Sequence, residues 1–91
     1  MRTVWKYDLD ISGPLNELAM PKNGIIRFLD MQYGLPKLWV EVYTEDEKAF
    51  RLFEWVGTGH AVPINGKYIG TAVVYNGNLV LHLYEILPIA R

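Results

Sequence analysis

The chain has no cysteine among its 91 residues, so disulfide bonds and thiolate metal sites are excluded. Small domains without disulfides are typical of a reducing cytoplasm. The first eleven residues contain no apolar segment of the kind that a signal peptide requires. No apolar run approaches the roughly 20 residues of a membrane-spanning helix. We therefore expect a cytoplasmic protein without a membrane partner.

An excess of charge of either sign is also missing. Nine basic and ten acidic residues give a formal net charge of −1, and the basic residues are scattered along the chain. Proteins that bind duplex nucleic acid rely on clustered cations that neutralise phosphates, so we expect no duplex DNA or RNA partner. Two or three cations that meet in space could still hold one small anionic ligand.

Apolar residues, in contrast, are abundant. They make up 51% of the chain, and three Trp, six Tyr and three Phe are among them. A chain of this length normally folds as one domain, and its interior is too small to hide this much apolar surface. We therefore expect a single domain over residues 1–91 that forms homo-oligomers.

Alternating apolar and polar side chains predict that this domain is built of strands. In residues 3–11, the side chains of Trp5, Tyr7, Leu9 and Ile11 share one face, as in a half-buried strand. Further strands are expected at 15–20, 25–33, 37–43, 49–56, 68–75 and 79–86. The sequence thus predicts an all-β fold, a small antiparallel sandwich or partly open barrel of about six to seven strands.

Proline and glycine residues determine two of these strand boundaries. Residues 15–20 could form a helical turn, but Pro21 and Gly24 follow too soon for a stable helix, so a short edge strand is favoured. Gly34-Leu35-Pro36 is expected to form the turn that follows the strand at 25–33.

Asn76-Gly77 is the strongest hairpin signal in the chain. A two-residue turn there pairs Tyr75 with Asn78, Val73 with Val80, Thr71 with His82, and Ile69 with Tyr84. Both faces of this hairpin are then mainly apolar, and an apolar face is not left bare to water. We expect another segment, such as the apolar tail at residues 86–90, or a second subunit to cover the face that contains His82.

The long irregular connection at residues 57–66 is the first candidate site, because long loops often carry function. The glycines of Gly57-Thr58-Gly59-His60 would let the backbone approach a ligand, and successive N–H groups can cradle an anion. No helix follows, so neither a dinucleotide-binding fingerprint nor a P-loop is present. The alternative is a tight turn that carries the chain from one sheet to the other.

His82, in the middle of a predicted strand, is the second candidate. It could be a core or interface histidine that hydrogen-bonds to Thr71 across the hairpin. Alternatively, it could anchor a ligand in an aromatic-walled pocket with Tyr84, Tyr75 and His60.

Trp39 could stack a flat ligand, because it lies beside Glu41 on what the alternation predicts to be a polar face. The alternative for Trp39, as for Trp5 and Trp55, is a place in the core or in an interface.

Neither metal nor catalytic chemistry is indicated. The two histidines would need a third ligand, and Glu85 lies on the face opposite His82. No serine or threonine lies in a recognisable nucleophile elbow, and the carboxylates cluster in a predicted solvated loop. We expect no metal, no cofactor and no enzymatic activity.

Six segments match a known pattern: Trp5-Lys6-Tyr7, Leu18 to Pro21, Leu38-Trp39, Val56 to His60 with Pro63, Tyr68 to Thr71, and His82 to Glu85. In these residues the chain resembles an uncharacterised family of short proteins from bacteria and their bacteriophages, and the Gly57-Thr58-Gly59-His60 loop is the most distinctive of them. The resemblance implies a bacterial or phage cytoplasm and an all-β fold. It implies no activity.

These observations lead to a first hypothesis, a non-enzymatic homo-oligomer that binds a small ligand. In a phage setting it would be a sponge that sequesters a nucleotide-like immune signal. The expected ligand-binding residues are Gly57, Thr58, Gly59, His60, Thr71, His82, Tyr84 and Trp39. The alternatives are a protein-binding module that inhibits a host protein through its aromatic surface, or a minor phage structural or assembly protein.

Overall fold

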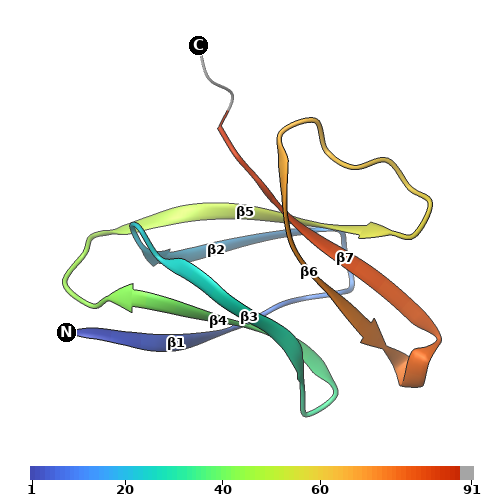
Figure 1. Ribbon diagram of the computed structural model, residues 1–91, viewed down its shortest axis with the longest axis horizontal. Coiled ribbons are helices and arrows are strands. Elements are labelled where there is room, and N and C mark those ends of the chain that lie inside the picture. Colours follow the sequence, from blue (N-terminus) through green and yellow to red (C-terminus); the bar gives the residue numbers. More distant parts are fainter. Residues whose placement is uncertain (89–91) are drawn as a thin grey trace.

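Seven strands form two antiparallel sheets in the computed structural model, which describes residues 1–88 (Figure 1). In chain order they are β1 (Arg2–Asp8), β2 (Leu15–Pro21), β3 (Ile25–Gln32), β4 (Leu35–Tyr43), β5 (Lys48–Gly57), β6 (Gly66–Val74) and β7 (Leu79–Ile86). Sheet A has the order β1-β4-β3, and sheet B has the order β2-β5-β7-β6. The predicted all-β sandwich is therefore confirmed, and the short strand predicted at 15–20 is the edge strand β2. Within residues 1–88, no helix is long and apolar enough to cross a membrane.

The core lies between the inner faces of the two sheets and follows the period of two that strands impose. Along β4, Leu38 and Val40 are fully buried, while Trp39 between them points outward and is only partly buried. On β5, Phe53 and Trp55 fill the facing layer, and the Trp55 indole donates a hydrogen bond to the Asp10 carbonyl (3.0 Å). The other buried members of the core are Leu9, Met20, Val42, Ala72, Val74 and Leu83.

The turn between β3 and β4 lies one residue earlier than the predicted turn at 34–36. Tyr33 (φ 53°) and Gly34 (φ 80°) form it, and positive φ at both central residues is the geometry that suits the twist of a two-residue hairpin. Pro36 belongs to β4, where its carbonyl accepts a hydrogen bond from the Leu9 N–H (3.1 Å). Proline lacks a backbone N–H, but this contact needs only its carbonyl oxygen, so Pro36 can take part in a strand. The predicted turn at 34–36 was therefore wrong.

The β6–β7 hairpin has the predicted register near its turn and a different one farther away. Val73 pairs with Val80, and Thr71 pairs with His82, as predicted. Beyond Thr71 a β-bulge interrupts the ladder, so Tyr68, and not Ile69, lies opposite Tyr84. The extra residue turns Ile69 inward, where it packs against the core. The predicted pairing of Ile69 with Tyr84 was therefore wrong.

At the tip of this hairpin, the strand ends one residue earlier than expected. Tyr75, Asn76 and Gly77 all have positive φ, and the Asn78 N–H donates to the Tyr75 carbonyl (3.1 Å). Asn76 and Gly77 thus occupy the left-handed positions for which this pair of residues is favoured.

The outer face of the β6–β7 hairpin is covered only in part. Val56 of the neighbouring strand is buried, but Val73 and Tyr75 are 53% and 63% exposed. Of the tail predicted to cover this face, Leu87 is 39% exposed, and Ile89 and Ala90 lie outside the described residues. The described part of the chain therefore leaves apolar surface on this face in contact with water.

One flank of the sandwich is formed by β3 and β6, which are edge strands of different sheets and lie close together (Figure 1). Each has a bulge, between Ile26 and Phe28 in β3 and between Tyr68 and Gly70 in β6. Gly70 allows the close approach, because a Cβ there would lie 3.0 Å from the Leu29 side chain. The two strands pack against each other at Gly70 and Leu29, and the two sheets are not joined there into a barrel.

Candidate functional site

The loop that follows β5 forms a hollow of about 210 Å³ together with His82 and Tyr84 of β7. Gly59 has a φ of 89°, which a residue with a side chain rarely adopts, and the His60 N–H donates to the Gly57 carbonyl (3.0 Å). The His60 ring lies against Gly57, where a Cβ would be 3.0 Å from its Nδ1. Both glycines therefore serve a tight turn. The alternative interpretation was wrong in one respect, because β5 and β6 both belong to sheet B and the loop does not carry the chain from one sheet to the other.

His82 is the centre of a chain of side-chain hydrogen bonds that links three segments. Thr58 Oγ1 lies 2.8 Å from His82 Nε2, and Thr71 Oγ1 lies 3.0 Å from His82 Nδ1. The Tyr68 hydroxyl extends the chain, at 2.6 Å from Thr71 Oγ1. The predicted hydrogen bond between His82 and Thr71 is confirmed. Because hydroxyl groups both donate and accept, either ring nitrogen of His82 can hold the proton of the neutral imidazole.

The walls of this hollow determine what it can accept. Tyr84 supplies an aromatic wall and contacts the Tyr68 ring edge-on, with centroids 5.5 Å apart. Among the described residues that line the hollow there is no lysine, arginine, aspartate or glutamate. The site is therefore suited to a small polar ring, and an anionic group would depend on backbone N–H groups of the glycine loop.

The structure brings together all the predicted site residues except Trp39. Gly57, Thr58, Gly59, His60, His82 and Tyr84 line the hollow, and Thr71 is hydrogen-bonded to His82. Trp39 lies on the outer face of sheet A, with its ring centroid 5.6 Å from that of Phe28. Tyr75, considered as a further wall, lies at the β6–β7 turn near Met31 and Gly34.

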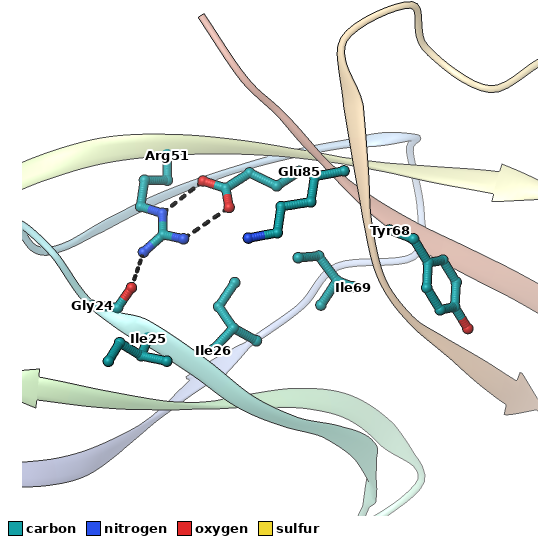
Figure 2. A pocket seen from close by; sticks show the side chains of 8 residues that line it. Gly24, Ile25, Ile26, Arg51, Tyr68, Ile69 and Glu85 are labelled. Atoms are coloured by element: carbon teal, nitrogen blue, oxygen red, sulfur yellow. Dashed lines mark hydrogen bonds and ion pairs between the residues drawn. The ribbon is translucent and has the colours of Figure 1, made fainter.

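A second cleft, of about 280 Å³, was not predicted from the sequence. It lies between β3 and β6, above the isoleucines of the inner faces, and Figure 2 shows the charged pair that forms part of its lining. Arg51 donates from Nε and Nη2 to the two carboxylate oxygens of Glu85, at 2.7 and 2.8 Å, and from Nη1 to the Gly24 carbonyl at 2.6 Å. Arg51 thereby connects β5 of sheet B with the start of β3 in sheet A.

The sequence did contain a signal for this cleft. Arg51 is spaced by two residues from Phe53 and by four from Trp55, so the three side chains share one face of β5. Glu85 shares a face of β7 with Leu81 and Leu83 in the same way, so both charges occupy positions that face the core. Charged residues at such positions are normally paired, and two of opposite sign on adjacent strands predict a buried ion pair.

The geometry also bears on metal binding. Glu85 faces the core while His82 faces outward, as the strand periodicity predicted. Within residues 1–88, no group of three or more histidine, aspartate or glutamate side chains is placed to hold a metal ion.

Two carboxyl groups near the end of β1 have pKa values below the usual range of aspartate. Lys37 Nζ lies 2.9 Å from Asp8 Oδ1, and this hydrogen bond and charge lower the pKa of Asp8. Asp10 accepts a hydrogen bond from the Ser12 N–H (2.8 Å), which lowers the pKa of Asp10. These interactions stabilise the β1 end of the sandwich. Neither Asp8 nor Asp10 lines the hollow beside His82 or the cleft between β3 and β6.

Comparison with known proteins identifies a family without an assigned activity. A family model described as "Domain of unknown function (DUF7352)" matches residues 1–88. No curated protein and no solved structure matches the chain. The matched range contains both sheets, the hollow beside His82 and the cleft between β3 and β6. The family assignment therefore applies to the whole described domain.

Proposed function

The chain belongs to the DUF7352 family of domains of unknown function, and we propose that it acts as a non-enzymatic homo-oligomer that binds a small ligand in the hollow beside His82. One observation carries the proposal. Residues from the 57–60 loop, β6 and β7 converge there, and their imidazole and hydroxyl groups form one continuous chain of hydrogen bonds.

The ligand that suits these groups is nucleotide-like. A flat heterocycle can stack on the Tyr84 ring, and its polar edge can exchange hydrogen bonds with the Thr58 hydroxyl and the His82 imidazole. A phosphate group would have to bind backbone N–H groups of the glycine loop other than that of His60, which donates to the Gly57 carbonyl. In the bacterial or phage cytoplasm that we propose as the setting, such a protein would act as a sponge that sequesters a nucleotide-like immune signal.

The proposed homo-oligomer rests on the exposed apolar surface around the hollow. Val62, Tyr68 and Val73 are each about half exposed, and the hollow itself is open to solvent. A second subunit placed against this face would bury these side chains and close the hollow over a ligand. The mass of the particle in solution, measured by light scattering after size exclusion, tests this part of the proposal, and a monomer at micromolar concentration contradicts it.

Calorimetry and thermal shift against a panel of cyclic and linear nucleotides test the ligand. Thr58→Val removes a hydroxyl that contacts His82, and we expect it to weaken binding about tenfold, the value of one or two hydrogen bonds. Thr44→Val is the matched control, because the Thr44 hydroxyl contacts the Met1 carbonyl and Glu45, away from the hollow. A cleanly folded oligomer that responds to no member of the panel contradicts the proposal.

A second candidate function, a protein-binding module, is favoured by the outer face of sheet A. Phe28, Val4 and Tyr43 are each about half exposed there, and Phe28 lies directly opposite Trp39 in the strand register. Aromatic clusters of this kind often provide most of the binding energy in protein interfaces. A partner captured from host lysate by the wild type but not by Phe28→Ala, with Phe50→Ala on the other sheet as control, would favour this function. Association with virions would instead favour a minor structural or assembly role.

A further inference from the structure

The cleft between β3 and β6 has features that the proposed function does not use. We propose that it is a second binding site, for a small carboxylate or phosphate monoester with an apolar body. The cleft lies on the inner side of sheet B, whereas the hollow beside His82 lies on the outer side. The two sites can therefore be tested separately.

The charges that line the cleft are unbalanced. Arg51 and Lys67 are cationic, and Glu85 is the single anion among the described residues that line it. Glu85 is only 6% exposed, and each of its carboxylate oxygens accepts a hydrogen bond from Arg51. Lys67 lies directly opposite Glu85 in the strand register, yet it forms no ion pair with any residue in the described range. The cleft thus has a net charge of +1, and an incoming anion would neutralise it.

The remaining surface suits an apolar body of limited size. Figure 2 shows Ile26 of β3 and Ile69 of β6 beneath the Arg51–Glu85 pair, with Ile25 beside them. At roughly 30 Å³ per water molecule, a volume of about 280 Å³ corresponds to some nine waters. A single aromatic or branched aliphatic group with one anionic substituent fits within this volume.

The site is also formed in advance of binding. The bulge in β6 is what turns Ile69 inward, and Arg51 is fixed by three hydrogen bonds of 2.6 to 2.8 Å. Bulges are common beside binding sites because they redirect side chains, and groups held in place before binding lose less entropy on association.

Titration of the 15N-labelled full chain, followed by NMR at constant ionic strength, tests the proposal with three probes. Benzoate and phenyl phosphate represent the two anionic chemistries, and benzyl alcohol is the neutral analogue. We expect both anions, or the one whose chemistry is correct, to shift the amide signals of residues 24–26 and 66–69. Benzyl alcohol should bind at least tenfold more weakly.

Substitutions then locate the charge. Lys67→Gln should weaken anion binding by about tenfold to a hundredfold, the value of a charge-assisted hydrogen bond, while Lys48→Gln, an exposed lysine at the start of β5, should not change it. Glu85→Gln removes the competing carboxylate and should tighten binding. Thr58→Val should have no effect, which separates this site from the proposed function. Three results would overturn the proposal: an unchanged affinity in Lys67→Gln, equal binding of benzyl alcohol, or signal shifts spread over the surface lysines. The test with Lys67→Gln remains decisive even if Glu85→Gln does not fold.

Discussion

Replacing Arg51 with methionine should lower the free energy of unfolding by about 3 kcal/mol. Methionine keeps most of the volume but leaves the Glu85 carboxylate, 6% exposed, without its two donors. Removing one partner of a buried ion pair costs about 3–5 kcal/mol. We place the value at the lower end because the Arg51 side chain is 22% exposed and the adjoining cleft admits water.

This loss is large for so small a domain. At about 0.05–0.15 kcal/mol per residue, the whole chain has a stability of roughly 5–14 kcal/mol. Each kilocalorie lowers the melting temperature by about 4–8 °C at this size, so the Arg51→Met variant should melt about 12–24 °C below the wild type. Urea unfolding followed by tryptophan fluorescence measures the free energy directly, since Trp55 is buried in the core.

Two further variants decide whether the reasoning is correct. Arg27→Met breaks a more exposed ion pair with Glu41 and should cost less than about 1 kcal/mol. The double variant Arg51→Met with Glu85→Met replaces both charges by apolar groups and should recover most of the loss. If Arg51→Met costs no more than Arg27→Met, the pair contributes no more than a surface contact and the reasoning is refuted. If the double variant is as unstable as Arg51→Met alone, the loss comes from the missing link to the Gly24 carbonyl and not from an unpaired carboxylate.

Three smaller predictions use the same unfolding assay. Gly24→Ala would place a methyl group 2.9 Å from a core valine and should lower the free energy of unfolding by about 1–3 kcal/mol. Gly13→Ala, with open space around it, should be neutral or slightly stabilising, and equal effects of the two substitutions would contradict this reasoning. Asn76→Ala should cost about 1 kcal/mol because Asn76 has a φ of 55° at the hairpin turn, and no loss would show that the turn relaxes without strain. Because Lys37 lowers the pKa of Asp8, the contribution of this carboxylate should be complete above its ordinary pKa of about 3.9 and be lost as the pH falls through the lower folded value. Asp8→Asn should therefore be less stable than the wild type near neutral pH, and the difference should disappear in acid; a difference independent of pH contradicts this account.

The sequence predicted the strands well because alternation reports burial directly. The short strand at 15–20 and the pairing of Thr71 with His82 followed from local signals, the proline that excludes a helix and the Asn76-Gly77 turn. Since that turn sets the register, it also placed the His82 side chain on the correct face.

The features that the sequence could not predict depend on contacts between sheets. Ile69 faces inward because β6 bulges where Gly70 meets Leu29 of the other sheet, and no local pattern reports that contact. The sequence left open whether Trp39 lies in the core, in an interface or on a polar face; the structure places it on the outer face of sheet A, and alternation alone does not say which sheet contains that face. The contact between Thr58 and His82 depends likewise on the path of the irregular loop.

The paired bulges of β3 and β6 have a consequence for the fate of the protein in a crowded cell. An unprotected edge strand offers a straight row of amide groups on which other chains can build fibrils. Both edges on this flank are interrupted by a bulge in the first half of the strand, so neither can add a strand along its full extent. Fibrillar growth should be blocked on this side, and the uninterrupted edge strands β1 and β2 are the edges left open to it.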